Sequence, residues 1–251
     1  MTWQPHAPDW LVARPIAHRG LHDPARGIIE NSLTAARRAI AKTYAIECDV
    51  QLSKDGEAIV FHDDTLTRLL GMPGEIGALA TQDLARCTYK GSSEQVATLP
   101  DFFAEIAGRT PLIVELKSRF DGDARLAARV ARLAANYAGP LALKSFDPQM
   151  LHALREDGTK RPLGLVAQAH YAAEDWPKLS ASQRRGLEAL VDFPGARPDF
   201  LSWHVGDLPH ATPMLRRVQG MKIMTWTVRN AAEQALTAQW ADQIIFEGFE
   251  P

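Results

Sequence analysis

The sequence is poor in several features that mark particular classes of protein. It has two cysteines in 251 residues, and its 28 Lys and Arg residues nearly balance its 30 Asp and Glu residues. Cys48 and Cys87 stand in no CxxC or Cys/His spacing, so a thiolate metal site is excluded and both are expected to be reduced core residues. The chain also has no basic block with which to displace counterions from a phosphate backbone. We therefore expect no nucleic-acid partner.

Long apolar runs are missing as well. No window of about 18 uninterrupted apolar residues occurs, and the N-terminal segment MTWQPHAPDWLVARP does not join a basic start to an apolar stretch. These absences predict a cytoplasmic protein without a stable membrane anchor. Nothing in the sequence indicates an oligomeric state.

What the chain does contain is an alternation of short apolar segments with helical stretches, the pattern of parallel βαβ units. Nine strands are expected, one more than an eight-stranded barrel needs. Because only a turn separates the second segment from the third, no crossover helix fits there and the irregularity is expected at that place. The nine segments are 13–18, 44–50, 57–62, 111–117, 140–146, 161–168, 199–205, 221–228 and 242–246.

The length favours a single unit. A (β/α) barrel routinely uses about 250 residues as one domain, and no linker or repeat divides residues 1–251. Residues 64–98 have little strand pattern and carry four glycines among other turn formers. We interpret them as a small insertion after the third strand.

Charged residues interrupt two of the apolar strands. Glu47 and Asp49 flank Cys48 and point to the same face of their strand, and Glu115 and Lys117 repeat this spacing. Burying an ionised carboxylate is costly unless it is paired or binds a metal, and one lysine is at hand for three acids. Three carboxylates without a thiolate favour a hard, oxygen-preferring ion, Ca²⁺ or Mg²⁺.

An ordinary ion-pair interpretation stays open beside the metal site. In it Glu115 pairs with Lys117, while Glu47 and Asp49 lie at a hydrated strand end. Two histidines favour the catalytic interpretation, because His18 and His62 both end predicted strands. Reactive groups gather at the carboxyl ends of strands in a (β/α) barrel, so the two imidazoles form a candidate acid/base pair.

Taken together, these motifs resemble the glycerophosphodiester phosphodiesterase family. The resemblance spans about residues 16–230 and rests on AHRG, GIIENS, IECDVQLSKDGEAIVFHDD, LIVELKS, KSFD and MTWTVRN in nearly the family's order. It implies a TIM barrel with a small insertion and an active site at the carboxyl ends of the strands. It also implies an enzyme that hydrolyses small phosphodiesters.

The resemblance assigns roles to residues that match its motifs. Glu47, Asp49 and Glu115 would ligate one divalent cation, Ca²⁺ or Mg²⁺, and two histidines would act as general acid and base. The remaining assignments concern the substrate and the surroundings of the metal. Arg19 and Lys117 would hold phosphate oxygens, Glu30 and Asn31 would shape the site, and Trp226 would offer an apolar wall to the glycerol carbons, with a core position as its alternative.

The chain departs from the family pattern near its end. IIFEGFEP stands where relatives carry a Thr-Asp-x-Pro-like segment, and Glu247 is a candidate replacement for the acid. Ile29 takes the place of a usual proline. Among other candidates, His204 or Trp203 is expected to border the pocket, and Ser145 is not expected to be a nucleophile. Surface positions are expected for the remaining histidines that were weighed, His22, His152, His170 and His210.

The expected function is metal-dependent hydrolysis of glycerophosphodiesters, such as glycerophosphocholine or glycerophosphoethanolamine, to sn-glycerol 3-phosphate and an alcohol. Two alternatives remain. One is a phospholipase D-like lyase that acts on lysolipids, although residues 64–98 lack the basic amphipathic character of a membrane-docking loop. The other is a barrel that binds phosphorylated ligands without turnover, which would have no need of a proton-transfer pair.

Overall fold

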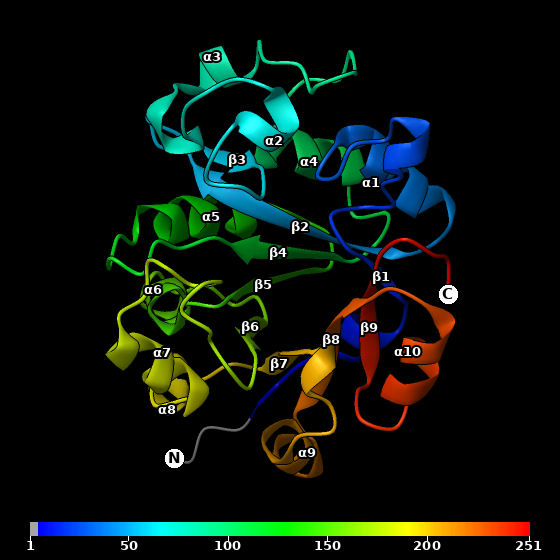
Figure 1. The fold of residues 1–251 in the computed structure, drawn as a ribbon, viewed down its shortest axis with the longest axis vertical. Helices are drawn as coiled ribbons and strands as arrows, with labels where there is room; N and C mark the ends of the chain where they lie inside the picture. The colour runs from blue at the N-terminus through cyan, green and yellow to red at the C-terminus, as the bar shows by residue number, and fades with distance from the viewer. Residues whose placement is uncertain (1–4) are drawn as a thin grey trace.

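A closed barrel of eight parallel strands organises the chain (Figure 1). The computed structural model describes residues 5–251; residues 1–4, which open the N-terminal segment considered above, lie outside the described residues. Pairing of the first strand with both the last and the second closes the sheet, so the predicted TIM barrel is confirmed. Its strands are β1 (Ile16–Ala17), β2 (Ala45–Leu52), β4 (Leu112–Leu116), β5 (Leu141–Ser145), β6 (Leu163–Ala167), β7 (Phe200–His204), β8 (Lys222–Val228) and β9 (Gln243–Phe246).

The ninth predicted strand also forms, outside the barrel. β3 (Ala58–Val60) pairs antiparallel with the end of β2 through Val50 and Val60. A short turn between two strands permits only the antiparallel arrangement, which explains why the irregularity lies where the sequence places it.

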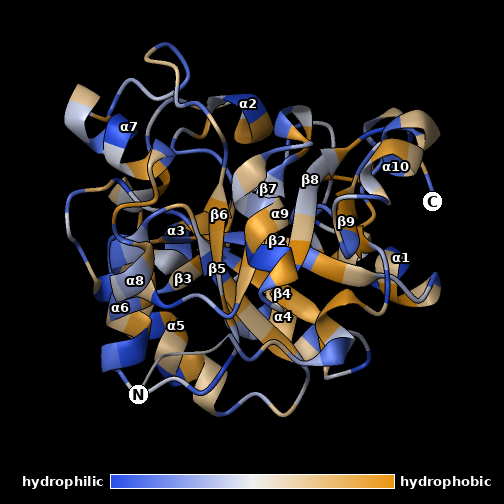
Figure 2. Cartoon of the chain, turned by 90° about the horizontal axis from the view of Figure 1, so that it is seen from below, coloured by the Kyte–Doolittle hydropathy of each residue, from blue (hydrophilic) through white to orange (hydrophobic). Residues whose placement is uncertain are grey.

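Helices cover the outside of the barrel, with their apolar faces against the strands. α5 buries Leu126 and Val130, as its sequence pattern predicts, and Ser32 caps α1 by accepting a hydrogen bond from the Ala35 amide. Figure 2 shows apolar strands at the centre of the molecule. None of the described helices is long and apolar enough to cross a membrane. The outer helices are α1 (Leu33–Ala41), α4 (Leu99–Ile106), α5 (Arg125–Ala135), α6 (Pro148–Glu156), α7 (Ala181–Glu188), α8 (Phe193–Ala196), α9 (Ala211–Val218) and α10 (Ala231–Thr237).

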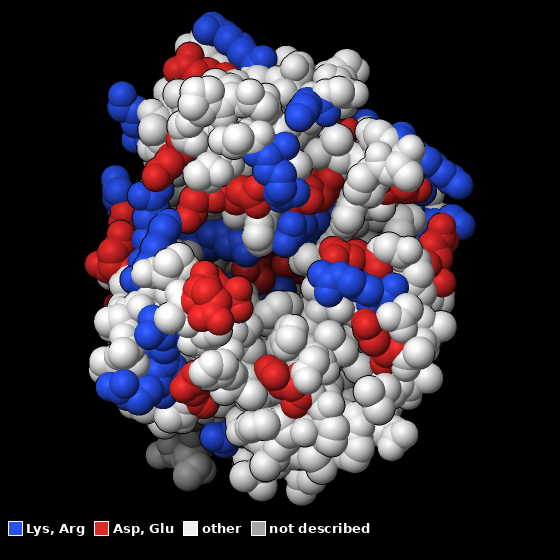
Figure 3. Space-filling model, in the orientation of Figure 1, with Lys and Arg blue, Asp and Glu red and all other residues white. Residues whose placement is uncertain are grey.

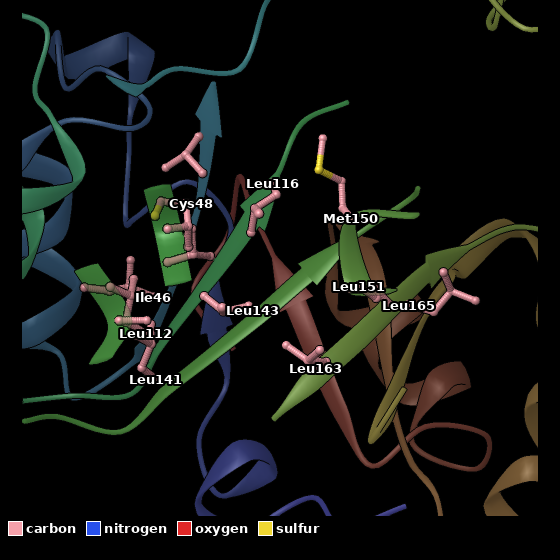
Figure 4. Close-up of a cluster of buried hydrophobic side chains, with 14 of the residues drawn as sticks. Ile46, Cys48, Leu112, Leu116, Leu141, Leu143, Met150, Leu151, Leu163 and Leu165 are labelled. Atoms are coloured by element: carbon pink, nitrogen blue, oxygen red, sulfur yellow. The ribbon is translucent and has the colours of Figure 1, made fainter. Parts of the chain in front are cut away.

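Two apolar cores hold the barrel together. The larger lies between strands and helices, where Cys48, Leu116, Leu143 and Leu151 pack (Figure 4). The smaller fills the inside of the barrel at the amino-terminal ends of its strands and includes Leu11 from the 3-10 helix η1 (Asp9–Val12). This inner core plugs that end, so polar side chains inside the barrel gather at the opposite end.

The segment between β3 and α4 carries short helices and a small core of its own. It contains α2 (Thr67–Leu70), η3 (Ile76–Ala78) and α3 (Thr81–Leu84), and these helices pack around Phe61, Leu66 and Tyr89. In Figure 1 it lies above the barrel, next to β3. Cys87 belongs here and is only half-buried, so the prediction that both cysteines are buried is right for Cys48 and wrong for Cys87. Both are free thiols.

Candidate active site

The three predicted metal ligands come together inside the barrel. Alternation along β2 turns Glu47 and Asp49 inward while Cys48 faces the outer core, and Asp49 lies beside Glu115 in the register of β2 with β4. One oxygen from each of the three carboxylates lies within 4.8 Å of the others, and all three residues are buried. Figure 3 shows charged side chains of both signs gathered in the central hollow of this face.

These acids have more partners than the sequence argument allowed. Lys117 Nζ lies 3.0 Å from Asp49 Oδ1 and 2.7 Å from Glu115 Oε1, as a neighbouring pair should. Lys144 Nζ lies 3.0 Å from both Glu47 Oε1 and Glu115 Oε2. The expectation of a single lysine for three acids is therefore wrong. Lys144 lies in β5, another apolar strand interrupted by a charge, and this was the signal that could have revealed it.

Neighbouring cations keep the carboxylates of Asp49 and Glu115 ionised. Burial raises the pKa of Asp49, but Lys117 above all, then His62 and Arg19, outweigh it and hold that pKa well below its usual range. Burial also opposes ionisation of Glu115, yet Lys117 and Lys144 lower its pKa to about 2. Both acids are therefore charged at neutral pH and available as ligands.

The triad fits a divalent cation. Carboxylate oxygens are the donors that hard cations prefer, and three acids contribute them from one small region. Glu47 Oε1 is buried and, despite its ion pair with Lys144, has no hydrogen bond with suitable geometry. An oxygen left short of donors in this way is suited to a metal bond. Together these features indicate a divalent metal site.

Arg19 and Asn31 are fixed beside the triad by an unusual backbone. Both have left-handed φ values, 55° and 56°, which non-glycine residues adopt at a cost of roughly 1 to 3 kcal/mol. Gly20 follows Arg19 because a Cβ there would come within 2.9 Å of Ala35. This backbone conformation places the backbone nitrogen of Arg19 3.1 Å from Glu47 Oε2. It also places the Arg19 guanidinium 3.3 Å from Asp49 Oδ2.

Asn31 and Glu30 complete this side of the site. The side-chain nitrogen of Asn31 donates a hydrogen bond to Asp49 Oδ2 at 2.9 Å. The side-chain oxygen of Asn31 accepts one from the backbone N–H of Asp49 at 3.1 Å. Glu30 accepts a hydrogen bond from Arg19 at 2.6 Å. Both predicted residues therefore lie at the site, and both act through neighbours, since they orient Asp49 and the Arg19 guanidinium.

Each candidate catalytic histidine is paired with a carboxylate through Nδ1. His18 Nδ1 lies 2.6 Å from Glu247 Oε2, and His62 Nδ1 lies 2.8 Å from Asp63 Oδ1. A carboxylate on one ring nitrogen orients the imidazole and leaves Nε2 for proton transfer. Both imidazoles also help to lower the pKa of Asp49, so they converge on the triad.

Two residues that support these histidine–carboxylate pairs come from parts of the chain whose role the sequence left open. Glu247, in the divergent final segment, also lies 2.7 Å from Arg229, and His18 and Arg229 help to hold its pKa well below the usual range although burial raises it. Arg68, from the segment after β3, donates to Glu30 and to Asp63. No local pattern identifies Arg68, because Glu30, which it joins to the nearby Asp63, is 38 residues away in sequence.

We expect Glu247→Gln to lower kcat by at least roughly tenfold, because the amide cannot stabilise an imidazolium at His18 as a carboxylate does. Steady-state turnover at saturating substrate measures the effect. Glu250→Gln is the matched control, since Glu250 is a nearby exposed acid paired with Lys42. Equal activity of the two variants would show that Glu247 does not position His18 for catalysis.

A cavity of about 740 Å³ opens beside the triad. Glu115, Lys117 and His62 line one part of it, and His204 and Trp226 line another. Aromatic rings form a continuous wall, since Phe146 lies 5.3 Å from Trp226 and 5.0 Å from Trp176 between ring centroids. Of the two residues expected to border the pocket, His204 does so, whereas Trp203 is buried in the outer core.

The remaining histidines and Ser145 divide between surface and structural positions. His152 and His170 are exposed, as predicted. His22 is not: its imidazole lies 3.6 Å from Glu247, because the loop after β1 folds back over the barrel. His210 is half-buried, caps α9 and stacks on Trp203 at 5.0 Å. Ser145 donates to the Leu116 carbonyl oxygen at 2.7 Å, which agrees with a structural role.

Known proteins share this architecture. A glycerophosphodiester phosphodiesterase from Caldanaerobacter subterraneus is 24% identical over 68% of this chain and 65% of its own length. The human lysophospholipase D GDPD3 is 30% identical over 46% of this chain and 39% of its own length. The chain thus spans less than two thirds of either relative. Among solved structures, an Oleispira antarctica phosphodiesterase in complex with the product sn-glycerol-3-phosphate has a TM-score of 0.75 at 22% identity, covering 95% of this chain and 94% of that one.

A second solved structure and a family model agree with these likenesses. The glycerophosphodiester phosphodiesterase from Thermotoga maritima has a TM-score of 0.71 at 22% identity and covers 96% of both chains. The model of the glycerophosphoryl diester phosphodiesterase family matches residues 18–248, from the first candidate catalytic histidine to just beyond Glu247. The chain therefore belongs to the glycerophosphoryl diester phosphodiesterase family.

Proposed function

We propose that this protein hydrolyses glycerophosphodiesters, such as glycerophosphocholine and glycerophosphoethanolamine, to sn-glycerol 3-phosphate and an alcohol. The observation that carries this proposal is the convergence of two histidine–carboxylate pairs on one buried acidic triad, where both imidazoles interact with Asp49. The Oleispira antarctica relative, which has the same fold, was solved with sn-glycerol-3-phosphate as its product. A barrel that only binds phosphorylated ligands would have no use for two oriented imidazoles.

Positive charge is the first requirement of this chemistry. A phosphodiester is an anion that repels nucleophiles, so the site must stabilise the negative charge that gathers on the transferring phosphorus group. Arg19 and Lys117 carry fixed positive charge beside the triad, and we assign them to the non-bridging phosphate oxygens. Ca²⁺ or Mg²⁺, held by Glu47, Asp49 and Glu115, would add Lewis-acid stabilisation of the same charge.

Proton transfer is the second requirement. One imidazole removes a proton from the attacking oxygen, and the other protonates the oxygen of the departing alcohol as its P–O bond breaks, each contributing about 10²- to 10⁴-fold in rate. When the neighbouring glycerol hydroxyl attacks, the product is a cyclic phosphate, which water then opens to sn-glycerol 3-phosphate. His18 and His62 are suited to this because Glu247 and Asp63 hold their Nδ1 atoms and leave Nε2 free for the substrate. Residues 64–98 belong to the same catalytic unit in this proposal, since Arg68 holds Asp63 and Glu30 in place.

The cavity beside the triad suits a cationic alcohol group. Aromatic faces attract quaternary ammonium ions, and Trp176, Phe146 and Trp226 line the wall. Asp175 and Asp207 also line the cavity and add negative charge. We place the alcohol of the substrate here, with Trp226 next to the glycerol carbons.

Trp176→Ala is expected to raise KM for glycerophosphocholine roughly fivefold or more, because an ammonium–ring contact is worth about 1 kcal/mol or more in a site shielded from water. KM for glycerophosphoglycerol, which has an uncharged alcohol, should change much less. Initial rates over a range of each substrate give both values. An equal rise in KM for both substrates would show that this cavity does not bind the ammonium group of the substrate.

The cavity also gives a reason to test lysolipids. Its aromatic wall is large enough for part of an acyl chain, and the human relative is named a lysophospholipase D. Incubation with glycerophosphocholine and, separately, with lysophosphatidylcholine distinguishes the two functions. We expect sn-glycerol 3-phosphate from the first substrate and little turnover of the second. Preferred release of choline from lysophosphatidylcholine, with a cyclic phosphate or a lysophosphatidate as the other product, would favour the lysolipid activity instead.

A further inference from the structure

Lys144 is the most deeply buried cation in the described part of the site. Its side chain is 2% exposed, and its ammonium lies 3.0 Å from one oxygen of Glu47 and 3.0 Å from one oxygen of Glu115. An ammonium this deep in a protein costs several kcal/mol unless anions surround it. Two of the three candidate metal ligands are therefore held by a charge that the chain itself supplies.

Lys144 differs from Lys117, the other lysine at the triad. The side chain of Lys117 is 22% exposed and lines the large cavity, where it can reach a bound phosphate. Lys144 lies behind the carboxylates and does not line that cavity. Its influence on the reaction must therefore pass through Glu47 and Glu115, which makes it a positioning residue.

The charges around the triad show what the position of Lys144 does for the site. The three carboxylates of the triad face three cationic side chains, those of Arg19, Lys117 and Lys144. Every carboxylate of the triad consequently has a cation within 3.3 Å before any metal binds. Acid clusters that rely on a metal for this compensation repel one another when the metal leaves.

We propose that Lys144 is an internal counter-ion that keeps the triad assembled in the metal-free protein and, in doing so, weakens the binding of the divalent cation. The inference rests on the metal site of the proposed function. Its two consequences have opposite signs. Lys144 stabilises the metal-free fold, and it lowers metal affinity because the arriving cation meets a positive charge among its ligands.

The test compares wild-type protein with Lys144→Met, which keeps the length of the side chain and removes its charge. Mn²⁺ serves as the probe ion; calorimetry measures its Kd, and thermal unfolding is followed with excess EDTA and with saturating Mn²⁺. Lys178→Met is the matched control, because Lys178 is an exposed lysine that also pairs with an acid, Asp64. None of these measurements uses substrate.

We expect Lys144→Met to bind Mn²⁺ at least about tenfold more tightly than wild type, a change of about 1.4 kcal/mol. In EDTA its Tm should fall by roughly 5 to 10 °C, and Mn²⁺ should restore most of the loss because a ligand of the folded state stabilises it. Wild type and Lys178→Met should gain less in Tm from saturating Mn²⁺ than Lys144→Met does, because they bind the ion more weakly. A lysine with a merely structural role would give a loss that Mn²⁺ does not restore.

Two results would overturn the proposal. One is a Kd for Mn²⁺ in Lys144→Met that equals or exceeds the wild-type value; the other is a Tm loss that persists at saturating Mn²⁺. If Lys144→Met does not fold in EDTA, refolding in Mn²⁺ decides the matter, and failure there counts against the proposal. The gain in Tm from Mn²⁺ gives a further check, since a gain as large in wild type as in Lys144→Met would contradict an internal counter-ion. A protein inactive on glycerophosphodiesters would still give these readouts, so the two proposals fail separately.

Discussion

Replacing His18 or His62 by alanine is expected to lower kcat on glycerophosphocholine by about 10²- to 10⁴-fold, because each variant loses one of the two proton transfers. Mn²⁺ affinity should change little, since neither imidazole belongs to the carboxylate triad. Steady-state rates at saturating substrate measure the catalytic effect, and calorimetry measures metal binding. The combination separates a catalytic loss from collapse of the site.

His152→Ala is the matched control for both variants. His152 is an exposed histidine on α6, and its imidazole pairs with Glu156 on the same helix. Its replacement should leave kcat within about twofold of wild type. Near-normal kcat in His18→Ala or His62→Ala would remove that histidine from the acid/base pair.

Glu115→Ala is expected to weaken Mn²⁺ binding by about 100-fold or more and to lower kcat/KM by a similar factor. The reason is that Glu115 is one of the three proposed ligand carboxylates and also pairs with both lysines of the site. Circular dichroism checks that the barrel still folds, because removal of this acid leaves Lys117 and Lys144 with one fewer partner each.

Glu75→Ala provides the comparison, since Glu75 is an exposed acid whose carboxylate pairs with Arg119 outside the triad. Both its Mn²⁺ affinity and its activity should stay near the wild-type values. A folded Glu115→Ala protein with unchanged Mn²⁺ affinity would return Glu115 to the ordinary ion-pair interpretation.

Local periodicity explains how much of the fold could be predicted from the sequence. Each barrel strand is a short apolar segment, and the segment that follows a tight turn can only pair antiparallel, as β3 does. The convergence of Glu47, Asp49 and Glu115 was predictable for the same reason, because parallel strands in a barrel bring their carboxyl ends to one side. Strand alternation then directs these acids inward.

Contacts between distant segments explain what could not be predicted. Arg68 reaches Glu30 across a connection without a recognisable motif, and His22 returns to Glu247 from the opposite end of the chain. Such contacts depend on how loops fold over the barrel, which no local pattern records. Lys144 is different, because the sequence shows it as a charged residue among the apolar residues of β5. It could have been predicted as a second cation for the three acids.

The most direct test of the central claim is a phosphorus NMR time course of purified protein with glycerophosphocholine. We expect sn-glycerol 3-phosphate to accumulate with Mg²⁺ or Ca²⁺ present, to stop accumulating in excess EDTA, and to resume when the ion is restored. Hydrolysis that continues at an unchanged rate after complete removal of divalent ions would contradict a metal-dependent site at Glu47, Asp49 and Glu115.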